Sequence, residues 1–547
     1  MAGARRAGLP VPGGSRRLLR APGRAQRGRL RRAGGDRGAA GRGPRAVNGS
    51  APSVVAVVLV TVATLAIGTW GLRFSRTTSD FFVASRTVRP ALNASAIGGE
   101  YLSAASFLGV AGLVLVFGAD MLWYPVGWTA GYLVLLVLVA APLRRSGAYT
   151  LPDFAEARLA SPRVRAASSL LVVAIGWLYL LPQFQGAGLV MEAAIGAPQW
   201  LGAVVVAVVV LVNVISGGMR SITFVQAFQY WLKLTALLIP AIVLLGVWVG
   251  DGAPNPADAA GGGDEGSLWS LPLGSGGAEG LYLTYSLIVA TFLGTMGLPH
   301  VVVRFYTNPD GRAARRTTMV VLGLLGIFYL LPPVYGALGR VYGGDARPDV
   351  LVLELPQLMV PGTGGDLLAA LVTAGAFAAF LSTSSGLSIA VAGVVSQDVF
   401  GRARLPGITA FRLGAVVAVA VPGLLALAAP NVGVARAVGL AFAVAASTFC
   451  PLLVLGIWWR GLTDVGALAG MAVGFLGSGT GVVYALGNEQ TLGWGAALLG
   501  QPAAWSVPLA FATMVVVSRA TRGRVPPHVL RFMVRLHTPE AVALDRG

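Results

Sequence analysis

Charged residues are scarce in this chain. Asp, Glu, Lys and Arg make up 12% of its 547 residues, whereas a soluble domain carries about 25%. Cysteine occurs once, at Cys450, so a disulfide framework or a cysteine-based metal site within one chain is excluded. The three histidines, His300, His528 and His537, form no metal-ligand spacing with one another. These absences exclude most soluble metalloenzymes.

Long apolar runs are abundant instead: hydrophobic residues make up 55% of the chain, and its mean hydropathy is +0.73. A spanning helix needs roughly 20 mostly apolar residues, and only helices and closed barrels satisfy their backbone groups in lipid. The runs are too long for barrel strands of about 10 residues. We therefore predict an all-α polytopic protein of the lipid bilayer with about 13 transmembrane helices, at residues 52–72, 91–116, 121–141, 166–190, 199–216, 224–249, 282–301, 318–340, 367–397, 409–427, 433–457, 465–486 and 504–518.

Arginine alternates between the gaps that separate these runs. Twenty-four arginines lie on one side, in the odd-numbered gaps and after the last run, and three lie on the other side. The positive-inside rule places the arginine-rich side in the cytoplasm. We therefore expect a multi-pass protein of the plasma (inner) membrane with a cytoplasmic C-terminus. Because the number of runs is odd, the N-terminus is expected outside.

The first residues do not fit this pattern. Residues 1–46 hold thirteen arginines and one acid, Asp36, which would then lie outside. Three interpretations are open: a start codon assigned too early, with translation beginning near Val47; a disordered tail that crosses despite its charge; or a span count that is wrong by one. The expected organisation is an Arg-rich tail over 1–50, a single transmembrane domain over 51–518 and a cytoplasmic tail over 519–547. The net charge of +19 follows this distribution, so no nucleic-acid partner is expected.

Two of the predicted spans are interrupted. Gly98-Gly99 lies within the second span, and Gly294, Gly297 and Pro299 lie within the seventh. Interrupted spans at corresponding positions of two halves point to a transporter site at the membrane midplane, between inverted repeats. We therefore predict two repeats of five helices, with one helix before them and two after.

Four hydroxyl residues, Ser382 to Ser385, run together in the ninth span. Hard oxygen ligands suit a small alkali cation, especially beside backbone carbonyls that are freed where a helix is broken. The alternative is helix packing, because serine and threonine commonly hydrogen-bond between membrane helices.

Four motifs carry a resemblance to a known family. They are EYLSAASFLG at 100–109, GTMGLPHVVVRFYT at 294–307, GVVSQD at 393–398 and GLAFAVAAS at 439–447. Over roughly residues 80–480 the chain resembles the sodium/solute symporter family, and within it the cation/acetate (monocarboxylate) branch. The resemblance implies a leucine-transporter-type 5+5 inverted-repeat fold, with a sodium site between the broken first repeat helix and the eighth core helix.

The resemblance also implies a set of sodium ligands. These are the backbone carbonyls of Gly99, Leu102 and Ala379 and the hydroxyls of Ser382 and Thr383. Gln226 stands where some family members have Asp, which weakens a second acidic ion site. Glu100 stands where acetate-type relatives usually have Asp.

Polar residues near the two breaks are candidates for substrate binding and gating. A carboxylate suits the positive N-terminal ends of half-helices, and the candidates for hydrogen bonds to it are Tyr101, Ser103, Ser106, Gln183 and Thr295. Charges inside a membrane are functional hypotheses by default, and the candidates for gating or coupling are Glu100, Lys233, His300 and Arg304. Structural pairing is the alternative for Glu100 and Lys233, and a solvated helix end for Arg304.

These features predict a secondary active symporter, in which inward movement of Na⁺ (or H⁺) drives uptake of a small monocarboxylate such as acetate, propionate or pyruvate. No enzyme activity, organic cofactor or obligate protein partner is expected. A symporter for another solute, such as an amino acid or a sugar, is the main alternative. Three other classes are disfavoured. A membrane prenyltransferase needs an Asp-rich metal motif, a sensor needs a longer C-terminal tail, and a channel needs a re-entrant segment. The sequence shows none of these features.

Overall fold

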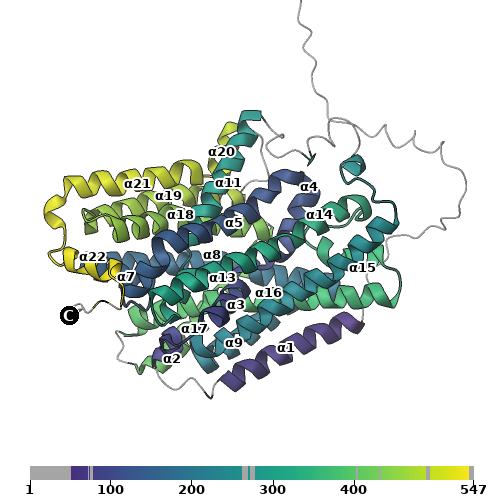
Figure 1. Ribbon diagram of the computed structural model, residues 1–547, viewed down its shortest axis with the longest axis horizontal. Helices are drawn as coiled ribbons and strands as arrows, with labels where there is room; N and C mark the ends of the chain where they lie inside the picture. The colour runs from purple at the N-terminus through teal and green to yellow at the C-terminus, as the bar shows by residue number, and fades with distance from the viewer. Residues whose placement is uncertain are drawn as a thin grey trace, which may run out of the picture. The chain divides into compact units, whose positions relative to one another are not determined.

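The computed structural model describes residues 51–71, 73, 78–260, 269–270, 277–401, 405–429, 433–487, 493–540 and 542 (Figure 1). The predicted Arg-rich tail over 1–50 lies outside the described residues, as do Arg76, Arg402 and Arg404. Regular structure in the described part is helical, as the long apolar runs predict.

Helices within the long apolar runs form the body of the bundle. They are α1 (Ala51–Gly71), α3 (Pro90–Tyr101), α4 (Val110–Phe117), α5 (Trp123–Val134), α6 (Ala140–Arg145), α8 (Pro162–Ile195), α9 (Gln199–Gly250), α11 (Gly277–Gly297), α12 (Pro299–Val303), α13 (Gly311–Tyr329), α14 (Leu331–Tyr342), α16 (Thr363–Val395), α17 (Gly407–Ala428), α18 (Val434–Trp458), α19 (Asp464–Gly487) and α21 (Ala503–Ala520). The other helices lie between these or follow them: α2 (Thr78–Val83), α7 (Leu151–Leu159), α15 (Leu351–Met359), α20 (Trp494–Gly500) and α22 (Val529–His537).

Eleven stretches of the described residues are long and apolar enough to cross a membrane. Two of them, Ala105–Arg145 and Gln199–Gly250, hold 41 and 52 residues, about twice the roughly 20 that one crossing needs. The second is bent at Gly218, whose φ of 54° is a left-handed conformation that glycine adopts readily. The all-α bundle is confirmed, and the count of 13 spans stays a prediction.

Both interrupted spans are broken in the structure. α3 ends at Tyr101, and Leu102 leaves helical geometry with a ψ of 82°. α11 ends at Gly297, Leu298 is extended, and α12 begins at Pro299. Proline lacks an N–H and disfavours helical geometry in the residue before it, so Pro299 sets the second break.

The first break lies beyond the Gly98-Gly99 pair, which remains helical. A Cβ on Gly98 would lie 2.7 Å from the ring of Tyr230, and one on Gly99 would lie 2.1 Å from the carbonyl oxygen of Gln226. Both neighbours belong to α9. The glycine pair therefore allows α3 to approach α9 closely, and the unwound turn follows it.

The helix with the hydroxyl run lies at the centre of the packing. α16 contacts α9, α8, α17 and α1 (Figure 1), and its side chains from Val372 to Val395 are all buried. Such a helix has no polar face to present to water, as expected for the inside of a bundle. α18 is similarly enclosed by α11, α19 and α8, and it buries the single cysteine, Cys450.

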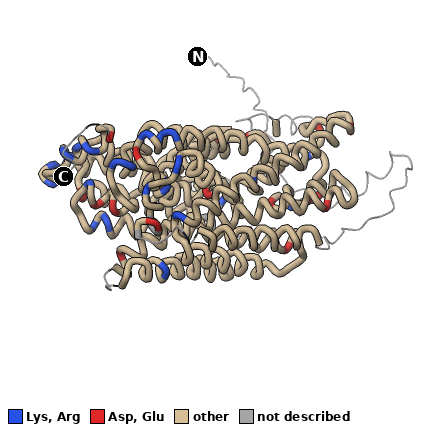
Figure 2. Tube along the Cα trace, turned by 60° about the horizontal axis from the view of Figure 1, so that its bottom comes forward, with Lys and Arg blue, Asp and Glu red and all other residues tan. Residues whose placement is uncertain are grey.

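The C-terminal segment folds back onto the bundle. α22 contacts α6 and α7, and Figure 2 shows most of the described basic residues, which are arginines apart from Lys233, gathered toward the end of the bundle where α22 lies. Arg158 of α7 is buried there and donates to the carbonyl oxygens of Gly456 (2.8 Å) and Trp459 (2.9 Å). Burial lowers the pKa of Arg158 to about 10, so the guanidinium stays charged at neutral pH.

Candidate functional site

The ammonium group of Lys233 lies at the break in α3. Its Nζ donates to the backbone carbonyl of Gly99, to that of Leu102 at 2.6 Å and to the hydroxyl of Ser382 at 2.7 Å. Lys233 belongs to α9, and its side chain is fully buried. Its ammonium group therefore links the end of α3 to α16. The residues predicted for gating and for cation binding thus meet at one point.

The other two predicted sodium ligands lie beside this point. The hydroxyl of Ser382 lies 3.1 Å from the carbonyl oxygen of Ala379, one turn earlier in α16. The hydroxyl of Thr383 donates to the backbone carbonyl of Glu100 at 2.7 Å. The structure therefore brings all five predicted ligands together, with two hydroxyls of α16 facing the broken end of α3.

A buried ion pair lies on the other side of the same turn. Arg304 Nε donates to a carboxylate oxygen of Glu100 at 2.6 Å, and the two side chains are 1% and 2% exposed. Arg304 also donates to the hydroxyl of Thr223 at 3.0 Å and to the side-chain oxygen of Gln226. The interpretation of Arg304 as a solvated helix end was wrong, because α12 is so short that its end is still inside the bundle. Structural pairing was the alternative interpretation of Glu100, and the structure shows such a pair.

Gln226 joins the ion pair to the hydroxyl helix. Its amide nitrogen donates to the backbone carbonyl of Ser382 at 2.8 Å, while its oxygen accepts from Arg304. An aspartate at this position would lack the amide donor. Glutamine therefore suits a position between a guanidinium and a carbonyl.

Buried aromatic rings surround the unwound turn. The ring of Tyr101 contacts those of Tyr132 (centroids 4.8 Å apart) and Phe442 (6.2 Å), and Trp128 stacks on Tyr329 (5.8 Å). We call this group, with Tyr179, the aromatic chamber. Tyr179 contacts Phe442 at 6.0 Å.

The predicted substrate-binding residues lie at or beside these rings. The hydroxyls of Tyr101 and Thr295 lie 2.7 Å apart, and those of Ser106 and Tyr329 lie 2.9 Å apart. Gln183 accepts from the backbone N–H of Ala104 at 3.4 Å. Ser103 is buried at the break itself. The five candidates therefore belong to one region, although their roles stay predictions.

Several buried polar groups in this region lack a hydrogen-bond partner within the described residues. They include the Nε2 of Gln183, both ring nitrogens of His300, the indole nitrogen of Trp128 and the hydroxyl of Tyr132. The ring of His300 lies edge-on to Tyr179 at 5.4 Å, and its helix leads into Arg304. His300 thus lies between the aromatic chamber and the buried ion pair.

Most of the aromatic chamber was not predicted from the sequence. The rings in question lie in apolar spans, where an aromatic residue usually packs in a core or at an interface; they are Trp128, Tyr132, Tyr179, Tyr329 and Phe442. In the structure Tyr132 and Trp128 are buried, although each carries a polar group that needs a partner. Only the packing shows which of these rings face the break.

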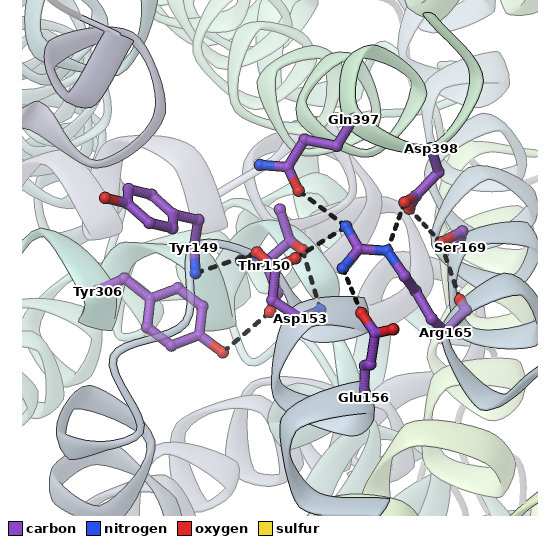
Figure 3. A network of polar contacts seen from close by, with 9 residues as sticks. All are labelled: Tyr149, Thr150, Asp153, Glu156, Arg165, Ser169, Tyr306, Gln397 and Asp398. Atoms are coloured by element: carbon purple, nitrogen blue, oxygen red, sulfur yellow. Dashed lines mark hydrogen bonds and ion pairs between the residues drawn. The ribbon is translucent and has the colours of Figure 1, made fainter. Parts of the chain in front are cut away.

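A second charged cluster lies away from this site (Figure 3). Arg165 forms ion pairs with Asp153 (2.9 Å), Glu156 (2.7 Å) and Asp398 (2.5 Å), and the hydroxyl of Ser169 donates to Asp398. The cluster joins α7, α8 and the end of the α16 span, beside a cavity of about 410 Å³. It therefore ties together helix ends at the basic side of the bundle.

Replacing Arg165 with glutamine is expected to destabilise the protein, because three carboxylates lose a shared partner. Charge-assisted hydrogen bonds contribute roughly 1.5–3 kcal/mol each when buried, and less here because the arginine is 24% exposed and partly screened. We expect a lower melting temperature of the detergent-purified protein. Arg163→Gln, at an exposed position of the same helix, is the matched control. Equal melting temperatures for the two variants would contradict a stabilising role.

Comparison with known proteins identifies the family. The family model described as sodium:solute symporter family matches residues 81–474. The chain is 32% identical over 433 residues to the uncharacterized symporter YwcA of Bacillus subtilis (strain 168), a match that covers 76% of this chain and 82% of that protein.

Two solved structures share the fold. A substrate-bound, outward-open Na⁺-coupled sialic acid symporter matches with a TM-score of 0.63 and 14% identity, over 86% of this chain and 98% of that chain. Mhp1, a nucleobase-cation-symport-1 family transporter in a closed conformation, matches with a TM-score of 0.50 and 16% identity, over 83% and 98%. These similarities confirm the leucine-transporter-type fold.

The matched segment contains both broken helices, the hydroxyl run and the buried ion pair. The chain is accordingly a multi-pass membrane transporter for a small solute and not an enzyme, and the family supports sodium as its coupling ion. The roles of individual residues stay predictions. By the extent of the family match and the identity to a curated symporter, this chain belongs to the sodium:solute symporter family.

Proposed function

We propose that this symporter imports a small monocarboxylate, such as acetate, propionate or pyruvate, driven by inward movement of Na⁺ (or H⁺). The observation that carries the choice of substrate is the charge of the buried cluster at the break. In their charged forms Lys233 and Arg304 are two cations, and Glu100 is the carboxylate that interacts with both. One positive charge is left unbalanced, and isolated buried charge is costly. A small anion would balance it.

The aromatic chamber supports a ligand with a short apolar part. Its rings are almost fully buried, and small-molecule sites are typically apolar with a few convergent polar groups. The free amide donor of Gln183 is of the kind that binds a carboxylate oxygen. A two- or three-carbon acid combines these two requirements.

The basic end of the bundle supports the proposed orientation. Positive residues accumulate on the cytoplasmic side of membrane proteins, and most of the described arginines gather at the end of the bundle where α22 lies (Figure 2). We therefore propose a plasma-membrane protein with a cytoplasmic tail over 519–547 and an N-terminus outside.

An amino acid or a sugar remains the alternative substrate. A zwitterion or a neutral sugar would leave the extra positive charge of the cluster without a partner. The two classes therefore differ in whether the substrate neutralises the site.

Uptake by proteoliposomes tests the substrate. We expect purified protein to accumulate [¹⁴C]acetate under an inward gradient of Na⁺ or H⁺, because the anion balances the buried charge. Unlabelled propionate and pyruvate in about hundredfold excess should remove most of this uptake. Alanine and glucose should leave it unchanged, and protein-free liposomes serve as the control. Uptake of labelled alanine or glucose, without uptake of acetate, would refute the monocarboxylate assignment.

A further inference from the structure

The oxygens predicted to bind sodium are already used within the protein. The carbonyls of Gly99 and Leu102 and the hydroxyl of Ser382 accept from the ammonium of Lys233. The hydroxyl of Ser382 also reaches the carbonyl of Ala379, and that of Thr383 donates to Glu100. All five groups have partners, so the arrangement does not fit a further cation at the same point.

The basic residue that contacts these oxygens is of a type found nowhere else in the chain. Lys233 is its single lysine, whereas the other forty basic residues are arginines. An ammonium is a compact point charge with three N–H donors, whereas a guanidinium is a planar fork with five. Three oxygens converging from two helices match the three donors of an ammonium. The single lysine therefore lies at a position where the planar donors of an arginine would not match the three oxygens.

No carboxylate forms an ion pair with Lys233 among the described residues. Glu100 of α3 acts on it electrostatically but pairs with Arg304. From α16 it contacts the hydroxyl of Ser382. The hydroxyl of Tyr335, on α14, donates to the backbone carbonyl of Leu237 in α9. Lys233 is therefore held chiefly by neutral oxygens, as a bound alkali cation would be.

We propose that the ammonium of Lys233 is the resident cation of this position, and that it keeps Na⁺ out. It joins the broken end of α3 to α16 in the way that the sequence analysis assigned to a sodium ion. Two positive charges about 4 Å apart repel each other by about 4 kcal/mol at an effective dielectric constant of about 20. The affinity of this position for Na⁺ is then lowered on the order of a thousandfold while the ammonium is present. A sodium ion that drives transport then binds at other groups. This inference deepens the proposed symport by naming the cation at its central position.

Removal of the charge tests the proposal through sodium binding. ²²Na⁺ binding to purified protein would be compared in the wild type, Lys233→Met and Lys233→Arg. Methionine keeps a long apolar side chain but leaves the three oxygens without their ammonium partner. We therefore expect Lys233→Met to bind Na⁺ at these oxygens with an affinity at least about tenfold higher than that of the wild type. Lys233→Arg keeps a permanent charge and should gain none. Adding Ser382→Ala to Lys233→Met should abolish the gain, because it removes a freed ligand.

The opposite pattern would overturn the proposal. The proposal is wrong if folded Lys233→Met binds no more sodium than the wild type. It is also wrong if Ser382→Ala alone removes the sodium binding of the wild type. Should Lys233→Met fail to fold, an experimental structure of the wild type in saturating NaCl decides. Side-chain density of Lys233 at the three oxygens supports the proposal, and an ion there with Lys233 turned away refutes it.

These measurements are independent of the substrate. Sodium binding and density are recorded without any solute, so a protein that carries no acetate can still show Lys233 at the site. Conversely, acetate uptake with a sodium ion at Ser382 would leave the proposed function intact and remove only this inference.

Discussion

Arg304→Ala is expected to abolish uptake and to destabilise the protein more than other single substitutions of a charged residue. The change leaves Glu100 buried without its ion-pair partner, and Thr223 and Gln226 lose a donor. Breaking a buried pair from one side costs about 3–5 kcal/mol, because the remaining charge is uncompensated. Melting temperature in detergent and [¹⁴C]acetate uptake in proteoliposomes measure the two effects.

Neutralising the partner separates the two effects of this change. Arg304→Ala with Glu100→Gln no longer buries an unpaired charge, so most of the lost stability should return. The net charge of the cluster is then the same as in the wild type. Uptake should stay absent all the same, because the ion pair that holds the end of α3 is missing. Arg312→Ala, at an exposed position of α13, controls for the loss of an arginine. A single Arg304→Ala variant as stable as Arg312→Ala would contradict the structure of the pair.

Gly99→Ala is expected to remove transport through packing alone. The added Cβ would lie 2.1 Å from the carbonyl oxygen of Gln226, and backbone cannot turn aside as a side chain can. α3 must then move away from α9, which displaces the carbonyl of Gly99 from Lys233. Overpacking typically costs 1–3 kcal/mol, so we expect about that loss of stability and uptake below detection.

A second glycine of α9 supplies the control for this experiment. A Cβ on Gly246 would meet nothing within 4 Å, so Gly246→Ala should keep full uptake. Its stability should be unchanged or higher, since alanine is favoured over glycine within a helix by up to about 1 kcal/mol. Normal uptake by Gly99→Ala would show that the close approach of α3 to α9 is not needed.

Much of the fold could be predicted from the sequence, because lipid permits few backbone structures. Long apolar runs predicted the helical bundle, and Pro299 predicted the second break, which lies directly before it. The first break was displaced from Gly98-Gly99. Glycine marks both unwound turns and close helix packing, and a sequence does not tell these two uses apart.

The site was harder to predict, because its contacts join distant parts of the chain. Glu100 and Arg304 are 204 residues apart, and Lys233 and Ser382 are 149. The sequence indicated Glu100, Lys233 and Ser382 as intramembrane polar groups, but hydropathy carries no information on which groups pair. Arg304 shows the difficulty: it follows an apolar run, as a residue at a membrane surface does, but the break at Leu298 keeps it inside the bundle.

The burial of Cys450 makes the chain a ready background for site-specific thiol labelling. The native sulfur lies inside α18, out of reach of water-soluble maleimides, so no native residue needs to be removed first. Cysteines introduced at the exposed positions Arg89, before α3, and Thr363, at the start of α16, would take up a pair of spin labels. Electron–electron distances between them would then follow the relative movement of the two helices through the transport cycle.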